Sequence, residues 1–505
     1  MRLGTERILL ALVVVFITIL YLLSLDDVKY YHYDSGRYMV LGKSLAEFNG
    51  FRLISSPGNP VENVYTPGYS LLLAFIFWFF KGNFLTAKIL SVFFAIATLL
   101  VAYRISELFF DKKTTLACTL VFGLSYWMML YSKSVLTESS YFFFSLCTLY
   151  FISKSDTTGK SVYRTVGFFF LAFSVAIKPT GMILSATVIL YYLLKRNVKT
   201  AFFPALCIIA VILWGLSVNY FFLKDSEYTE VVLAKKSEHR VLSLALNAAE
   251  KFIEYFRFYV PLNVFPLLLY SAGNFTKDYA AIGLASKVIG VAVSAILWIG
   301  VAAYVKKKGF TLFLLYVISS TAIAFNWSIA AYGRHISPYL LFFIIYFVYG
   351  LKSIVSPFPM KGIFSRNVIF SLIIASMVAF SVLNGVHNSV SLKGTWISPS
   401  WTDFFETSDY LKKRCSGNEV ILNNQPFAMY LETDCKTVSY YPYYEELPKN
   451  LSAYIADVGV TYVVTDDFRK QNDVELENLL SSNTKRFRKI YSSKEHLVTV
   501  YEVTN

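Results

Sequence analysis

The chain has 505 residues, of which 56% are hydrophobic and only 16% are charged, and its formal net charge is +14. Soluble domains carry about a quarter charged residues, so this composition excludes an ordinary soluble enzyme. Uncharged apolar runs of about 18 residues recur, which is typical of helices that cross a membrane. The positive charge collects in short loops between these runs, where it sets topology, so no nucleic-acid partner is expected.

The apolar runs predict an α-helical polytopic membrane protein with about eleven transmembrane helices. The predicted spans are residues 8–25, 84–103, 114–132, 139–153, 165–177, 180–194, 200–223, 288–305, 310–330, 336–351 and 368–386. No small-residue cleavage site follows the first run, so we interpret it as an anchor and not as a cleaved signal peptide.

Clusters of Lys and Arg predict which side each loop occupies, because cytoplasmic loops are enriched in these residues. The clusters are Arg2 and Arg7; Arg104, Lys112 and Lys113; Lys154, Lys160 and Arg164; Lys195, Arg196 and Lys199; Lys306 to Lys308; and Lys352, Lys361 and Arg366. With all of them cytoplasmic, the N-terminus is cytoplasmic and the C-terminus extracytoplasmic. We expect a multi-pass protein of the plasma (inner) membrane.

One apolar run does not fit this count. Residues 67–80 are uncharged but too few for a span, and they are more typical of a re-entrant or interfacial segment. We therefore predict that residues 26–83 form one long outer loop with helices lying on the membrane. A second outer loop, residues 224–287, has apolar residues at helical spacing from Leu242 to Val260 and predicts an amphipathic helix on the membrane.

This topology places ionisable residues from four loops on the outer face. They are Asp34, Glu138, Lys178, Arg334 and His335. Charges at the hydrocarbon boundary cost about a few kcal/mol each, so they tend to be paired or functional, although a single one can be an interfacial anchor. A carboxylate beside cations suits a reaction in which a hydroxyl loses its proton while a phosphate departs.

Five segments in order carry a resemblance to a known family. They are YDSGRYMVLGKSLAEFNGFRL, VYTPGYSLLLAFIFWFF, SVLTESSYFFFSL around Glu138, AIKPTGMIL around Lys178 and YGRHISPYLL around Arg334. Together they resemble the class C (GT-C) glycosyltransferases, in particular the protein mannosyltransferase and lipid A aminoarabinose transferase group, families 39 and 83. The resemblance covers residues 1–390.

The resemblance implies an inverting, integral-membrane glycosyltransferase that moves a hexose or pentose from a polyprenyl-phosphate donor. The acceptor is a hydroxyl of a lipid, glycan or protein on the extracytoplasmic face. Asp34 would be the base and Glu138 a second acid at the site. Lys178, Arg334 and His335 would contact the donor phosphate. A polytopic flippase or transporter of lipid-linked sugars, or a cell-envelope assembly protein, is the alternative.

Two further residues complete the predicted site. Arg37 lies one helical turn beyond Asp34, so it is expected to orient that carboxylate or to touch the phosphate. Tyr65 is expected in the substrate groove. It lies in Tyr65-Thr66-Pro67-Gly68, where the family often has Lys before two prolines.

The chain also departs from the family pattern elsewhere. Asp34 is followed by Ser35, whereas many relatives have an acidic pair. The oligosaccharyltransferase motif WWDYG is absent, which argues against whole-glycan transfer to asparagine.

No cofactor is assigned from the sequence. The chain has no glycine-rich phosphate loop and no His or Cys spacing typical of zinc. A divalent cation could share the binding of the phosphate with the basic side chains, and the sequence leaves this alternative open.

Residues 391–505 are more polar and predict a small extracytoplasmic α/β domain, so residues 1–390 form the transmembrane domain. Strands are predicted at 420–422, 462–464 and 498–501, and helices at 401–414 and 473–480. Cys415 and Cys435 share this domain and are expected to form a disulfide in an oxidising compartment. The other cysteines, Cys118, Cys147 and Cys207, lie within predicted spans.

The topology has a direct test. A reporter fused after Lys361 should lie in the cytoplasm and one fused after Asn505 outside it, because the basic loops are held inside. Paired fusions to a fluorescent protein and to a periplasmic phosphatase measure this. The same side for both positions would overturn the eleven-helix arrangement.

Overall fold

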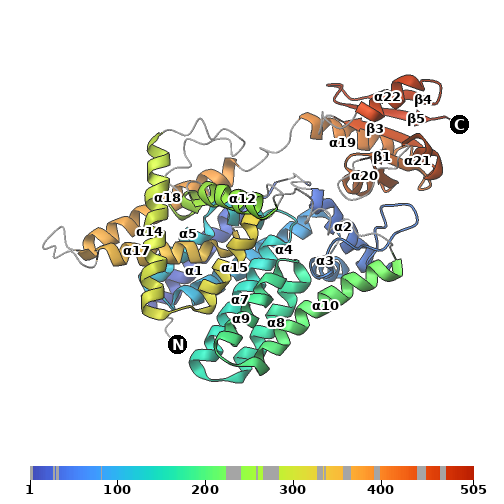
Figure 1. Ribbon diagram of the computed structural model, residues 1–505. Helices are drawn as coiled ribbons and strands as arrows, with labels where there is room; N and C mark the ends of the chain where they lie inside the picture. Colours follow the sequence, from blue (N-terminus) through green and yellow to red (C-terminus); the bar gives the residue numbers. More distant parts are fainter. Residues whose placement is uncertain are drawn as a thin grey trace. The chain divides into compact units, whose positions relative to one another are not determined.

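The computed structural model describes residues 4–26, 29, 33–80, 82–222, 240–256, 260–265, 284–326, 334, 337–355, 366–391, 399–440, 451–466 and 474–504. Contacts divide the chain into two compact units. Figure 1 labels helices and strands of both units. The first comprises residues 1–25, 88–214 and 232–393, and the second comprises residues 26–87, 215–231 and 394–505.

The first unit is helical. Its described elements are α1 (Thr5–Leu23), most of α4 (Phe84–Ser106), α5 (Lys112–Gly123), α6 (Tyr126–Ser132), α7 (Glu138–Thr158), α8 (Ser161–Ile177), α9 (Gly181–Leu194), most of α10 (Val198–Phe222), α12 (Arg240–Glu254), α13 (Val260–Val264), α14 (Leu284–Lys308), α15 (Leu312–Asn326), η4 (Ser337–Tyr339), α17 (Leu340–Val355) and α18 (Arg366–Ser391). Every predicted span overlaps one of these helices. Helices satisfy their own backbone groups, which is required in lipid.

Five of the described helices are long and apolar enough to cross a membrane: α1, α4, α14, η4 with α17, and α18. Helices α5 and α6 would make a sixth crossing, bent by 58° at the break between them. Helices α8, α9 and α15, the Val198–Ala210 part of α10, and α3 (Gly68–Phe79) of the second unit are apolar but shorter. The polytopic helical character is thus confirmed, whereas the count of eleven stays a prediction.

Close helix packing in the first unit depends on small residues. A Cβ atom added to Gly300 of α14 would lie 1.8 Å from the carbonyl oxygen of Tyr346, and one added to Gly350 of α17 would lie 2.0 Å from that of Ile296. Only glycine at both positions lets the two backbones meet in this way. Small residues commonly serve this purpose between helices in membranes, where no water drives the helices together.

The predicted amphipathic helix between residues 240 and 254 is present as α12. Leu246 and Ile253 are exposed on it, and the chain beyond it buries Tyr255 and Phe256. Its placement on a membrane surface stays a prediction.

The second unit contains a five-stranded mixed sheet in the order β2-β1-β3-β5-β4. The strands are β1 (Val420–Asn423), β2 (Lys436–Ser439), β3 (Tyr462–Asp466), β4 (Phe487–Ser492) and β5 (Val498–Val503). Strand β1 runs parallel to β2 and β3, and β5 runs antiparallel to β3 and β4. The three predicted strands are confirmed as β1, β3 and β5, while β2 and β4 were not predicted.

Each face of the sheet has its own apolar core. On one face Ile421, Val464 and Val500 pack with residues of α19 (Pro399–Lys412) and α20 (Pro426–Thr433). On the other, Leu422 and Val463 pack with residues of α21 (Leu451–Asp457) and α22 (Val474–Ser482). The helices predicted at 401–414 and 473–480 are confirmed as α19 and α22. The small C-terminal α/β domain is therefore as expected.

The predicted first outer loop joins this domain. Its helices α2 (Tyr33–Ala46) and α3 (Gly68–Phe79) pack on each other, and α2 also packs on α20. A Cβ atom at Gly36 would lie 2.9 Å from the Cβ of Phe427, so glycine is needed where α2 meets α20. The amide of Thr437 in β2 donates to the carbonyl of Ser55 at 2.7 Å. The predicted boundary near residue 390 did not anticipate this grouping.

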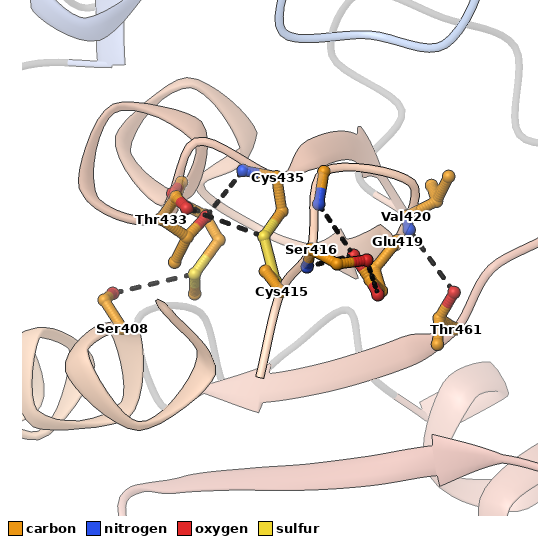
Figure 2. The surroundings of a disulfide bond; sticks show 10 residues. Ser408, Cys415, Ser416, Glu419, Val420, Thr433, Cys435 and Thr461 are labelled. Carbon is orange, nitrogen blue, oxygen red and sulfur yellow. Dashed lines mark hydrogen bonds between the residues drawn. A yellow bond between two sulfur atoms is a disulfide. The ribbon is translucent and has the colours of Figure 1, made fainter. Parts of the chain in front are cut away.

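The expected disulfide is present. Cys415 and Cys435 are bonded with their Cα atoms 6.1 Å apart, which ties the end of α19 to the end of α20 (Figure 2). The Cys435 amide donates to the hydroxyl of Thr433 at 3.2 Å, and Glu419 accepts from the Ser416 amide and hydroxyl at 2.7 Å each. The disulfide therefore holds α20, the element that contacts α2.

Candidate functional site

The candidate residues form two groups, one in each unit. Asp34 lies in the first turn of α2 in the second unit, where the positive end of the helix dipole favours a carboxylate. Its side chain is partly exposed. The hydroxyl of Tyr65 donates to Asp34 Oδ1 at 2.5 Å. A charge-assisted hydrogen bond of this length stabilises the ionised carboxylate and fixes its orientation.

Arg37, one turn along α2, forms an ion pair with Glu62. Its Nε donates to Glu62 Oε2 at 2.7 Å, and its Nη2 donates to Glu62 Oε1 at 2.8 Å. The side chains are 5% and 0% exposed. Such a two-bond pairing is among the strongest between an arginine and a carboxylate. The ion pair described for Arg37 is thus with Glu62, and its predicted contacts with Asp34 and with a phosphate stay predictions.

Glu62 also organises the backbone that leads to Tyr65. Its Oε1 accepts from the amides of Val64 and Tyr65 at 2.7 and 3.0 Å. Burial alone would lower the pKa of Arg37, but the charge and hydrogen bonds of Glu62 outweigh burial and raise that pKa above its usual value. Arg37 therefore keeps its charge although it is buried.

Glu62 was missed from the sequence. The sequence contained a signal for it. The apolar run Tyr38 to Leu41 follows Arg37 and predicts that the arginine is buried, and a buried arginine requires a carboxylate partner. That reasoning asks for an acid in the same loop. It does not choose among the acids of that loop, and only the fold selects Glu62; the acids are Asp26, Asp27, Asp34, Glu47 and Glu62.

The second group lies in the first unit and centres on Glu138. Glu138 begins α7, is 0% exposed, and accepts through Oε1 from Lys178 Nζ at 2.9 Å and from Arg334 Nε at 2.6 Å. Lys178 ends α8 in an extended conformation because the next residue is Pro179, which disfavours helix in the residue before it. The structure therefore brings together three predicted residues from three separate segments.

A small pocket lies beside this second group. Its volume is about 20 Å³, enough for about one water molecule. Lys178 and Arg334 both line it, together with Tyr141, Tyr316 and Tyr339. The side chains of Lys178 and Arg334 are 12% and 23% exposed, so the two cations that hold Glu138 also border accessible space.

The two cations set the protonation state of Glu138, which lies just outside the predicted span 139–153. Burial alone would raise the pKa of this carboxyl, but Arg334 and Lys178 outweigh burial and hold the pKa well below its usual range. The two cations therefore favour the ionised form of Glu138, and the carboxylate in turn holds both cations in place.

The remaining predicted features are less complete. His335 lies outside the described residues, so its expected phosphate contact stays a prediction. Among the described residues, no group of three His, Cys, Asp or Glu side chains is arranged to hold a metal ion. A role for a divalent cation stays open, and we assign no protein ligands to it.

Comparison with solved structures identifies the fold. No protein-family model and no curated protein sequence matches the chain. The structure of ArnT from Cupriavidus metallidurans bound to undecaprenyl phosphate matches with a TM-score of 0.63 at 10% identity, over 99% of this chain and 98% of that one. The archaeal oligosaccharyltransferase AglB from Archaeoglobus fulgidus, in complex with an inhibitory peptide and a dolichol-phosphate, matches with a TM-score of 0.60 at 10% identity, over 100% and 75% of the two chains.

A third match is the arabinofuranosyltransferase AftD from Mycobacteria, with a TM-score of 0.50 at 11% identity, over 99% of this chain and 40% of that one. These proteins are GT-C glycosyltransferases. The GT-C fold expected from the sequence motifs is thus confirmed. At such low identity, the likeness establishes the fold and leaves donor, acceptor and residue roles open.

The buried pair in the second unit yields a stability prediction. Glu62→Gln should lower the free energy of unfolding by about 3 kcal/mol or more, because it removes the carboxylate charge that pairs with buried Arg37. Thermal unfolding of the purified full chain in detergent measures this. Glu406→Gln is the control, because Glu406 pairs with the exposed Lys494 and should change little. Equal effects of the two substitutions would contradict the role of the buried pair.

Proposed function

We propose that the protein is an integral-membrane glycosyltransferase that moves a sugar from a polyprenyl-phosphate donor to an acceptor hydroxyl. The observation that carries this proposal is that Glu138 binds Lys178 and Arg334, two cations that line a pocket within a GT-C fold. Two proteins that share the fold were solved with undecaprenyl phosphate and dolichol-phosphate. A lipid-linked phosphate is therefore the donor chemistry that the fold and the cations favour together.

On the donor side, Lys178 and Arg334 bind the phosphate. Glu138 holds both side chains in place through one oxygen, so their orientation is fixed before the donor arrives. As the sugar leaves, the phosphate gains negative charge, and fixed cations stabilise that charge without reorganising. His335 of the same loop is a further phosphate contact in this proposal.

On the acceptor side, Asp34 is the base. The acceptor oxygen attacks the anomeric carbon, the bond from that carbon to the phosphate oxygen breaks, and the bonding electrons leave with the phosphate. The acceptor proton passes to the carboxylate of Asp34, and the polyprenyl phosphate departs with one more negative charge. One displacement by one base inverts the configuration at the anomeric carbon.

A donor panel tests the proposed function. Purified protein in nanodiscs is incubated with undecaprenyl-phosphate-linked hexoses and pentoses and with lipid, glycan and protein acceptors, and release of undecaprenyl phosphate is followed by mass spectrometry. Turnover of at least one donor is expected. Movement of intact donor across the bilayer without release of lipid phosphate would favour the alternative, a flippase of lipid-linked sugars.

Replacement of the proposed base has a sharp expected result. Asp34→Asn keeps the shape of the side chain but removes its basicity, so turnover should fall by at least about 100-fold while undecaprenyl phosphate still binds. Asparagine serves at the first turn of a helix about as well as aspartate, so the fold of α2 is retained. A fully active Asp34→Asn enzyme would end the assignment of Asp34 as base.

Removal of either phosphate-binding cation should act on the donor. Lys178→Ala or Arg334→Ala should weaken binding of undecaprenyl phosphate by about 10-fold or more, since a hydrogen bond to a charged group is lost. Titration of the lipid phosphate, with protein melting temperature as the signal, measures this. Lys160→Ala is the matched control, because Lys160 is exposed in a predicted cytoplasmic loop. Unchanged affinity in both variants would make the two residues interfacial anchors.

A further inference from the structure

We propose that Tyr65 is a positioning residue that orients the Asp34 carboxylate, and that the buried Arg37–Glu62 pair, covered by α20 of the C-terminal domain, holds Tyr65 in place. This inference rests on the proposed function, in which Asp34 is the base. It assigns Tyr65 a different task from the substrate contact expected of it.

The position of Tyr65 is fixed from several sides. Glu62 accepts from its backbone amide and from that of Val64. The Arg37 guanidinium lies 4.7 Å from the centre of the Tyr65 ring, and the ring of Tyr38 meets it edge-on at 4.9 Å. With backbone and ring both held, the phenol has little freedom left, and its hydroxyl donates to Asp34 Oδ1.

The Tyr65 hydroxyl engages one oxygen of the carboxylate, Oδ1. A base must hold its reactive oxygen toward the acceptor proton, and a donor fixed on Oδ1 turns the plane of the carboxylate so that Oδ2 has a defined direction. The same hydrogen bond favours the ionised form of Asp34, which is the form that accepts a proton. Among the described residues, the groups that act electrostatically on Arg37 are Tyr33 on α2 and Glu62 and Tyr65 on the following loop, and Tyr38 of α2 meets the ring of Tyr65.

The C-terminal domain completes the arrangement. Phe427 of α20 lies with its ring centre 5.4 Å from the Arg37 guanidinium, on which Tyr65 also packs, and it meets the ring of Tyr33 at 5.2 Å. Tyr430 of α20 joins the same apolar cluster. The ion pair is shielded from water, because Arg37 is 4% exposed and Glu62 is 0% exposed. The domain therefore contributes to catalysis by burying the pair that positions Tyr65.

The decisive variant is Tyr65→Phe, which removes one hydroxyl and keeps the ring. The carboxylate band of Asp34 is isolated as the infrared difference between the full-length wild type and Asp34→Asn in detergent, and it is titrated with and without Tyr65→Phe. The pKa of Asp34 should rise by about one unit or more when the donor is lost. This readout needs no sugar donor.

The matched control is Tyr410→Phe, which removes a hydroxyl of α19 in the same unit, where it donates to the carbonyl of Ile490. It should leave the Asp34 titration unchanged. A titration that is equally unchanged in Tyr65→Phe would overturn the positioning role, since the hydrogen bond would then have no influence on the carboxylate.

Turnover of an undecaprenyl-phosphate-linked sugar gives the second readout. The turnover rate falls at low pH because the base becomes protonated, and this fall is the acid limb of the pH–rate profile. Tyr65→Phe should move the acid limb to higher pH by as much as it raises the pKa of Asp34. Phe427→Ala should also move the acid limb to higher pH. Phe427→Tyr, which keeps the ring, should leave the acid limb at its wild-type position.

The two proposals fail in different ways. An inactive Asp34→Asn with an unmoved acid limb in Tyr65→Phe rejects the positioning role alone. An active Asp34→Asn rejects the base, and with it the proposed mechanism, whatever Tyr65→Phe shows.

Discussion

Both groups of candidate residues depend on the cost of burying charge. An ion removed from water is tolerated only beside an opposite charge with its hydrogen bonds made, and breaking such a pair costs more than forming it gains. Glu62 pairs with buried Arg37 and also accepts two backbone amides. Glu138 likewise receives Lys178 and Arg334 through one oxygen. In each case the counter-charge fixes geometry that the proposed chemistry then uses.

The helical part of the fold was predictable because lipid leaves the backbone few options. Apolar runs without charges must be helices, and all eleven predicted ones overlap helices of the structure. The C-terminal strands β1, β3 and β5 were predictable because they are apolar. Strand β2, with the sequence KTVS, and the edge strand β4, with charged Arg488 and Lys489, lack that pattern. Helix α20 begins with Pro426, a common first helical residue that would have indicated it.

The candidate site was predictable in its members and not in its pairings. Asp34, Glu138, Lys178 and Arg334 stood out as charges beside apolar runs, and Glu138 does meet both cations. The partner of Arg37 and the direction of the Tyr65 hydroxyl depend on the path of residues 47–67. Apolar residues in this segment do not recur regularly at helical or strand spacing, so its path could not be predicted. The close approach of Gly36 to Phe427 joins residues that are far apart in the chain, and local patterns contain no information about it.

The contact between α2 and α20 also has a consequence for biosynthesis. About 390 residues separate Arg37 from Phe427, so at usual rates of translation the arginine is made roughly 20 to 80 seconds before the ring that covers it. During that interval α2 lacks one of its packing partners, whereas the helices made after it can already associate. The helix that bears Asp34 is thus made well before the element that completes its packing. A nascent chain of this protein would acquire its proposed activity only after α20 has been made and has folded onto α2.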